Sequence, residues 1–291
     1  MINKKSLYFL HIPKTGGLVL RNLSKILEEK GLSVFSTFGG RFTEFTDFNF
    51  INSHFGITPI NIETFDTAVL IREPFDRVIS NFTWFMMNNT FDYKSEYKNL
   101  SIEQKIKKYL FEDTKSDAHK NLQTKFLTSY VSEEYLNNKY RYFVNNDPLP
   151  NIPSEVLGSQ QKLYEYNLEI RTRDWFLTNN NFSIEYAKSN LDKCLIIGTT
   201  DNHDAFMDKI FNWIKNNWDL DLQEEFKTIV AEKTSESGLP YYNYGLFTDS
   251  NGKTYTSADF KSMLTEEEIA QIYADNSLDV ELYEYAKAKL Q

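Results

Sequence analysis

A lysine and two glycines near the start of the chain could bind an anion. They lie in the run His11-Ile12-Pro13-Lys14-Thr15-Gly16-Gly17, which ends a short apolar segment and precedes an amphipathic one. Glycines allow backbone N–H groups to converge on an anion, and a helix that starts behind them adds the partial positive charge of its N-terminus. Lys14 adds a full charge. The spacing predicts a phosphate-binding loop, and the alternative is a plain strand-to-helix turn with a solvated lysine.

The order of these residues differs from that of the common nucleotide loops. A Walker A loop requires Gly-x-x-x-x-Gly-Lys-Ser/Thr, whereas Lys14 here precedes Gly16 and Gly17. The dinucleotide fingerprint Gly-x-Gly-x-x-Gly is also missing from this loop. A kinase or NTPase of the P-loop type therefore stays an alternative that the loop does not favour.

A second candidate anion site lies where another apolar run meets a helical pattern, at Arg72. Ser80 follows about two helical turns later. A planar guanidinium and a hydroxyl placed in this way can bracket a phosphate, with the arginine giving paired hydrogen bonds. The alternative is that Arg72 and Arg77 form ion pairs with the neighbouring Glu73 and Asp76.

Strand and helix patterns alternate along the chain and position these residues. Short apolar runs predict buried parallel strands at Ser6–Ile12, Thr67–Ile71, Lys193–Gly198 and, more weakly, Phe50–His54. Helical patterns follow the first three, at Leu18–Lys30, Phe75–Met87 and Asp204–Asn217. We expect Asp201 or Asp204 to cap the last of these helices and Trp84 to lie in the buried end of the second. The alternation predicts an α/β fold with a central parallel sheet flanked by helices.

The rest of the chain is mainly helical in pattern. A long helical insertion is predicted over Ser101–Asn190, with a proline-containing break at Asn146–Pro153. Ser235–Asp259 reads as a surface loop, and Thr265–Leu290 as helix with a break at Asp275–Ser277. Because no shift in composition marks a boundary, we expect one domain over residues 1–291.

Composition and charge exclude several classes of protein. With 32 basic and 41 acidic residues the net charge is -9, which argues against coating a nucleic acid. The single cysteine, Cys194, excludes an intramolecular disulfide and a multi-cysteine metal site, and we expect it to be buried on a strand. No signal peptide and no apolar run of membrane-spanning length are apparent, so we expect a soluble, cytoplasmic protein.

Taken together and in this order, the two junctions resemble the sulfotransferases that use 3′-phosphoadenosine 5′-phosphosulfate (PAPS) as donor, particularly their carbohydrate sulfotransferase branch. The run at His11–Gly17 looks like the 5′-phosphosulfate loop of that family. Ile71-Arg72-Glu73-Pro74, with Arg77 and Ser80, looks like its 3′-phosphate element. Further stretches are similar to other family segments: Asn121–Leu127, Leu195–Thr200 and Asn276–Ala286.

The resemblance implies a P-loop-like sulfotransferase fold, PAPS as sulfuryl donor, PAP as product and no metal. The 5′-phosphate would be held by the loop residues Pro13, Lys14, Thr15, Gly16 and Gly17. Lys14 would also lie near the bridging oxygen, on which charge builds as the S–O bond breaks. Arg72 and Ser80 would bind the 3′-phosphate, and Lys233-Thr234 resembles a late family loop that closes over it. The family commonly has a hydroxyl residue after the second glycine, where this chain has Leu18-Val19.

An acceptor hydroxyl needs a general base, because an alcohol is a poor nucleophile until its proton is being removed. His54 matches the place of a catalytic histidine in the carbohydrate enzymes; the alternative is an ordinary loop histidine. If His54 is not the base, Glu44 or Asp47 is the next candidate. Of the other histidines, His11 is expected to pack under the phosphate loop, His119 could approach the acceptor, and His203 is a neighbour of a helix cap.

The acceptor implied by the resemblance is a sugar hydroxyl on a polysaccharide or glycolipid. An acidic protein is a poor partner for a highly sulfated polyanion, which favours a weakly charged acceptor. Other hydroxyl or amine acceptors stay open, as does a nucleotide-binding module of the same fold without activity. The lack of a predicted membrane anchor, unlike the Golgi relatives, suggests a microbial or viral source and a cytoplasmic reaction.

Overall fold

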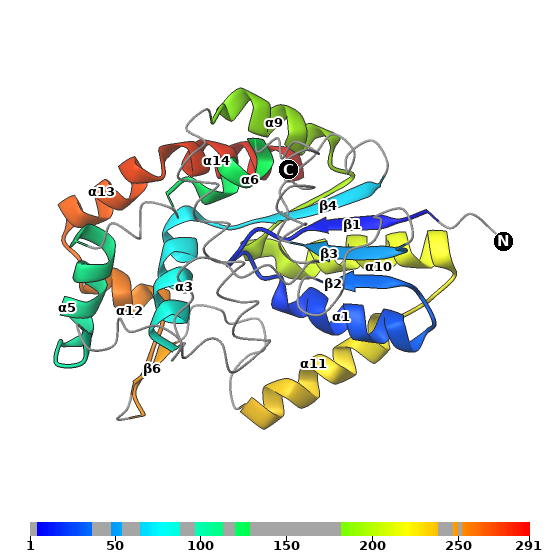
Figure 1. Cartoon of the computed structure of the whole chain (residues 1–291), viewed down its shortest axis with the longest axis horizontal. Helices are drawn as coiled ribbons and strands as arrows, with labels where there is room; N and C mark the ends of the chain where they lie inside the picture. Colours follow the sequence, from blue (N-terminus) through cyan, green and yellow to red (C-terminus); the bar gives the residue numbers. More distant parts are fainter. Residues whose placement is uncertain are drawn as a thin grey trace, which may run out of the picture.

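The computed structural model describes residues 5–36, 48–53, 65–87, 97–112, 120–128, 182–237, 247–249 and 252–291. A five-stranded parallel sheet in the order β2-β3-β1-β4-β5 lies at its centre (Figure 1). The strands are β1 (Leu7–Leu10), β2 (Val34–Ser36), β3 (Phe50–Ser53), β4 (Asp66–Ile71) and β5 (Ile196–Thr199). The predicted α/β fold with a central parallel sheet is confirmed.

The register brings the carboxyl ends of the strands to one edge of the sheet. Leu10, the last residue of β1, lies between Ser53 of β3 and Val69 of β4. Ile71 at the end of β4 lies beside Thr199 of β5. The segments that leave these strands therefore start next to one another, at the edge where open α/β sheets place their ligands.

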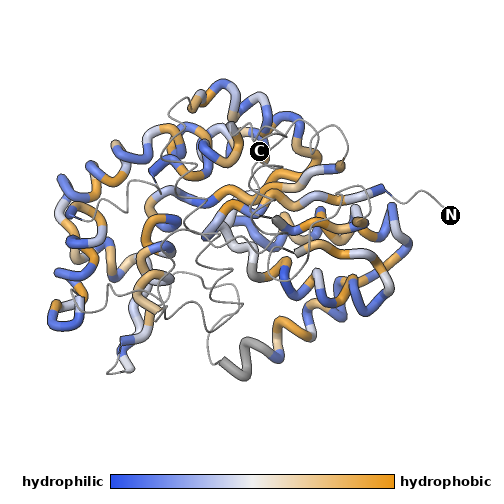
Figure 2. The backbone as a smooth tube through the Cα atoms, in the orientation of Figure 1, coloured by the Kyte–Doolittle hydropathy of each residue, from blue (hydrophilic) through white to orange (hydrophobic). Residues whose placement is uncertain are grey.

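Side chains alternate between the two faces of the sheet and bury two separate cores. Leu7, Phe9, Ala68 and Leu70 point to one face, and Tyr8, Leu10, Val69 and Ile71 to the other. The first face is covered by α1 (Leu18–Glu29), α10 (His203–Trp218) and α11 (Gln223–Ser237). The second is covered by α6 (Leu122–Thr128), α9 (Ile184–Lys193) and α14 (Ser277–Leu290). Figure 2 shows the strands coloured mainly as hydrophobic between these two layers.

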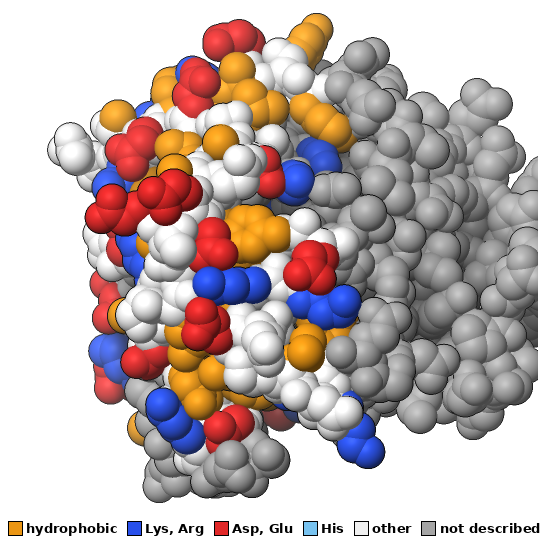
Figure 3. Space-filling view, turned by 90° about the vertical axis from the view of Figure 1, so that its left-hand side faces the viewer, with side chains coloured by type: hydrophobic (Ala, Val, Ile, Leu, Met, Phe, Trp, Pro, Cys, Tyr) orange, Lys and Arg blue, Asp and Glu red, His pale blue; other side chains and the backbone are white. Residues whose placement is uncertain are grey.

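A third core lies beyond the carboxyl edge of the sheet, around α3 (Pro74–Met87). It is completed by α5 (Ile102–Lys107), the π-helical turn η2 (Lys108–Glu112), the hairpin β6 (Phe247–Thr248) and β7 (Thr254–Tyr255), α12 (Ser257–Ser262) and α13 (Glu266–Asp275). Figure 3 views the molecule from this side, where acidic and basic side chains are interspersed around apolar ones. In the described part of the chain, no helix is long and apolar enough to cross a membrane.

Several local predictions need correction. Strand β2 was not predicted, because its three residues are too few for a pattern. The cap of α10 is Asn202, without a side-chain hydrogen bond, and not Asp201 or Asp204. The segment predicted as a loop after Ser235 contains the β6–β7 hairpin, because Phe247 and Tyr255 pack into the third core. The predicted break at Asn146–Pro153 lies outside the described residues.

One of two further predictions was right only in part. Cys194 is buried as expected, but it ends α9 and precedes β5, because its N–H completes the helix by donating to the carbonyl of Leu191. The helical end of the chain is confirmed, with its break at Asn276 between α13 and α14.

Candidate functional site

The segment after β1 turns sharply into α1. Lys14 has φ +70° and Gly16 has φ +96°, both in the left-handed region, which only the glycine adopts without strain. Gly17 is the N-cap of α1, with no side-chain hydrogen bond to the helix start and no acidic residue in the first turn. The first N–H groups of an α-helix have no partner within the helix, so this end is suited to an anion.

The second glycine of the loop is required by a close contact. A Cβ atom on Gly17 would lie 1.9 Å from Nε2 of His11, although the φ of Gly17 is an ordinary -67°. The His11 ring is fixed from the other side, where its Nδ1 lies 3.1 Å from Oδ1 of Asn52 in β3. His11 thus supports the loop from below, as the sequence predicted.

Thr15 stabilises the turn itself. Its side chain is fully buried, and its hydroxyl donates to the carbonyl oxygen of Ile12 at 2.9 Å. Its N–H donates to the same oxygen at 3.3 Å. Val19, one of the two apolar residues after the glycines, is buried in the first core. These residues shape the loop and anchor it to the sheet.

The Lys14 side chain lies beside Trp84 of α3. Its Nζ is 5.7 Å from the centre of the indole ring. Burial, and then the positive charge of Arg72, lower the pKa of Lys14 to about 7. Trp84 is 40% exposed, so the prediction that it is buried was wrong. Lys14 can therefore hold or release a proton near neutral pH.

Arg72 joins the second junction to the first. It directly follows β4, is buried, and donates from Nη1 to the carbonyl oxygen of Lys14 at 3.1 Å. Glu73 caps the following helix, since its Oε2 accepts from the N–H of Asp76 at 2.8 Å. A guanidinium and a lysine ammonium thus meet at one loop, an arrangement that suits a ligand with more than one negative charge.

Arg77 and Ser80 lie fully buried on α3. Arg77 pairs with a distant carboxylate, since its Nε lies 3.5 Å from Oδ2 of Asp279 in α14. Arg77 therefore ties α3 to α14. Glu73, one of the partners suggested from the sequence, also favours the charged form of Arg77. Ser80 lies two turns into α3, on the same helix as Trp84.

Other predicted site residues lie in less defined places. His54, Glu44, Asp47 and His119 fall outside the described residues. Lys233 and Thr234 lie in the last turns of α11, where the backbone is helical although a loop was expected.

His203 is a neighbour of the phosphate loop that the sequence did not reveal. A Cβ on Gly16 would lie 3.8 Å from its Nε2. Burial lowers the pKa of His203 to about 4, against the opposing effect of Asp204. The ring is therefore neutral at physiological pH. Its only sequence signal was its place after an apolar strand.

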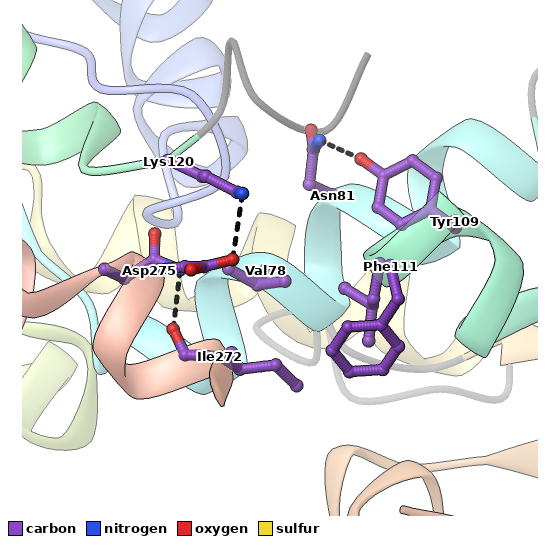
Figure 4. Close-up of a pocket in the computed structure, with 9 residues that line it drawn as sticks. Val78, Asn81, Tyr109, Phe111, Lys120, Ile272 and Asp275 are labelled. Carbon is purple, nitrogen blue, oxygen red and sulfur yellow. Dashed lines mark hydrogen bonds and ion pairs between the residues drawn. The ribbon is translucent and has the colours of Figure 1, made fainter. Parts of the chain in front are cut away.

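A small hollow lies on another side of α3, between that helix, η2 and α13 (Figure 4). Lys120 and Asp275 form an ion pair of 2.9 Å at its edge, and Asn81 donates to the hydroxyl of Tyr109. None of the site residues predicted from the sequence lines it. The junction of Lys14 and Arg72 is therefore the stronger candidate site.

Comparison with known families agrees with this geometry. A family model described as the Sulfotransferase family matches residues 1–286 of the chain. The match includes the loop after β1, the Arg72 junction and most of α14. No curated protein matches the sequence.

Proposed function

Because the chain belongs to the sulfotransferase family, we propose that Lys14 and Arg72 lie in its donor site and that the acceptor is a sugar hydroxyl. The enzyme transfers a sulfuryl group, and PAPS is the donor typical of its family. The observation that carries the proposal is the hydrogen bond from Arg72 Nη1 to the Lys14 carbonyl oxygen, 3.1 Å long. It joins the Arg72 side chain to the backbone of Lys14, at the sheet edge where open α/β sheets place their ligands.

The residues of the first loop suit the 5′ end of such a donor. The N–H groups of Gly16 and Gly17 donate to no backbone carbonyl in the part of the chain that the structure describes. Together with the uncapped start of α1 and with Lys14, they would hold the 5′-phosphate. Thr15 and Pro13 would give this loop its shape.

Lys14 would also assist the reaction itself. In sulfuryl transfer the acceptor oxygen bonds to sulfur while the bond from sulfur to the bridging phosphate oxygen breaks, leaving negative charge on that oxygen. A cation placed there stabilises the transition state more than the ground state. With its pKa lowered to about 7, Lys14 is able to share or give its proton to the leaving oxygen.

Arg72 and Ser80 would bind the 3′-phosphate that distinguishes PAPS from an ordinary adenylate. Arg72 offers a charged, planar donor next to the first loop. Lys233 and Thr234, at the end of α11, would complete this side of the site.

His54 is our candidate for the general base. It directly follows Ser53, the last residue of β3, which pairs with Leu10 at the end of β1. The chain therefore leaves β3 next to the strand that carries the phosphate loop. A histidine near this edge could take the proton of an acceptor hydroxyl.

The proposed acceptor is a weakly charged polysaccharide or glycolipid. The net charge of -9 disfavours a highly sulfated chain. This choice follows from the resemblance of the two junctions to carbohydrate sulfotransferases.

Ligand binding and transfer test the proposal separately. We expect PAP to raise the melting temperature well above the shift given by 5′-AMP, and Mg-ATP to give no larger shift than 5′-AMP. A transfer screen with labelled PAPS over neutral glycans, glycolipids and small alcohols should then label a sugar. Equal shifts with PAP and 5′-AMP would contradict the 3′-phosphate site, and labelling of alcohols alone would contradict the sugar acceptor.

A further inference from the structure

The side chain of Gln123, in α6, is bonded to the backbone of Arg72. The N–H of Arg72 donates to Gln123 Oε1 at 2.7 Å, and Gln123 Nε2 donates to the carbonyl oxygen of Arg72 at 2.8 Å. Gln123 is fully buried. Because β4 ends at Ile71, Arg72 has left the strand. The side-chain amide of Gln123 thus makes the two hydrogen bonds that a neighbouring strand would make, and it holds the backbone N–H and carbonyl of Arg72 in place.

Gln123 is in turn held by a carboxylate from α14. Its N–H donates to Oδ2 of Asp279 at 3.1 Å. The N–H and the hydroxyl of Thr124 donate to Oδ1 of Asp279 at 2.8 and 2.9 Å. Asp279 therefore caps the first turn of α6 and fixes the backbone position of Gln123.

The capping is reciprocal. Oδ1 of Asn121, just before α6, accepts from the N–H groups of Leu278 and Asp279 at 3.0 and 3.2 Å. Asn121 has a φ of +51°, a conformation that asparagine tolerates better than most residues. The starts of α6 and α14 are thus locked together, and Arg77 joins the same carboxylate from α3.

We infer that Gln123 is a positioning residue, which through Arg72 sets the preference of the enzyme for a nucleotide with a 3′-phosphate. This inference rests on the proposed role of Arg72. The Arg72 backbone is fixed by Gln123, and its guanidinium reaches the loop that carries Lys14. Without the amide, the Arg72 backbone is no longer held and its bond to the Lys14 carbonyl weakens. The first loop keeps the bond of Thr15 to Ile12 and the support of His11, so most of the loss falls on the 3′-phosphate.

The test compares the dissociation constants of PAP and 5′-AMP by calorimetry. In the wild type we expect PAP to bind much more tightly. Gln123→Leu should weaken PAP by about tenfold to a hundredfold, the value of a charged hydrogen bond, and leave 5′-AMP within about twofold. The matched control is Thr124→Val, which removes a bond to the same Asp279 without touching Arg72. It should lower stability but keep the ratio of the two constants.

A second variant covers the case in which Gln123→Leu does not fold. In Gln123→Glu a protonated carboxyl can both accept from the Arg72 N–H and donate to its carbonyl, whereas a carboxylate can only accept. The ratio of the two dissociation constants in this variant should therefore match the wild-type ratio at low pH. As the pH rises, the preference of the variant for PAP should fall below that of the wild type. A preference that stays at the wild-type value in both variants, or an equal loss for both ligands, would overturn the inference. A wild type without preference would instead contradict the proposed function.

Discussion

The guanidinium of Arg72 donates to the carbonyl oxygen of Lys14 at 3.1 Å, which joins residues 58 positions apart. The contact places two positive charges at one loop, and the charge of Arg72 contributes to lowering the pKa of Lys14. A bound anion would relieve this repulsion. The two residues thus couple the protonation of the site to the binding of its ligand.

The first prediction is that PAP binding takes up a proton at Lys14. The pKa of Lys14 is about 7 in the free protein, so at pH 8 most molecules have lost this proton. The phosphates of the ligand favour the charged form and raise the pKa. Calorimetry at pH 8 in two buffers with different ionisation enthalpies should show uptake approaching one proton, and affinity should fall as the pH rises above 7. Lys14→Met should abolish the uptake; its persistence would assign the proton to another group.

The second prediction concerns stability and pH. The pKa of Lys14 is lowered from 10.5 to about 7 in the folded protein. Between these values the unfolded state binds more protons, so this residue makes the protein more stable as the pH rises. Lys14→Met removes the effect and should stabilise the protein at pH 6 by on the order of 2 kcal/mol. Urea unfolding at pH 6 and pH 9 checks this, and an equal difference at both values would contradict it.

The third prediction concerns turnover. Lys14→Met should lower kcat by roughly a hundredfold to a thousandfold, since it removes the cation from the leaving oxygen. Lys25→Met, on the exposed side of α1, is the control and should keep the wild-type rate. A Lys14 variant that kept its kcat and lost only affinity would reduce the role of this lysine to binding.

The sequence predicted four of the five strands of the sheet, all but β2, and both junctions, because buried strands and glycine turns leave local signals. It did not reveal the bonds from Gln123 to Arg72 and from Asp279 to Gln123, which cross 51 and 156 residues. The family resemblance included the segments that contain Gln123 and Asp279, but it did not indicate what their polar side chains bind. Such partners are set by the packing of distant helices, which no local pattern encodes.

The fourth prediction is that Gly17→Ala disrupts the phosphate loop. The added Cβ would overlap the His11 ring at 1.9 Å, and that ring is held by Asn52. We expect a loss of stability of about 1 to 3 kcal/mol, typical of overpacking, together with loss of PAP binding. Gly31→Ala is the control: its φ of +81° carries a backbone cost, but a Cβ there meets nothing within 4 Å. It should keep PAP affinity, and a Gly17 variant with normal affinity would show that the loop tolerates displacement of His11.

The fifth prediction compares the stability lost when a buried ion pair, that of Asp279, is broken with the stability lost when an exposed one is broken. Both oxygens of Asp279 face donors: Thr124 on Oδ1, and Gln123 with Arg77 on Oδ2. Asp279→Asn turns an NH₂ group toward one of these donors and removes the negative charge that acts most strongly on Arg77. Because removing one partner of a buried pair is costly, we expect a loss of about 3 to 5 kcal/mol in chemical unfolding.

Asp192→Asn is the matched control, because Asp192 pairs with Lys289 at 2.7 Å on the surface, where its side chain is 44% exposed. Solvent weakens such a pair, so the control should lose less than about 1 kcal/mol. If the two substitutions cost the same, the bonds among α3, α6 and α14 would not hold the Arg72 junction together. A large loss for Asp279 alone would show that the helices behind the sheet edge stabilise it through this one carboxylate.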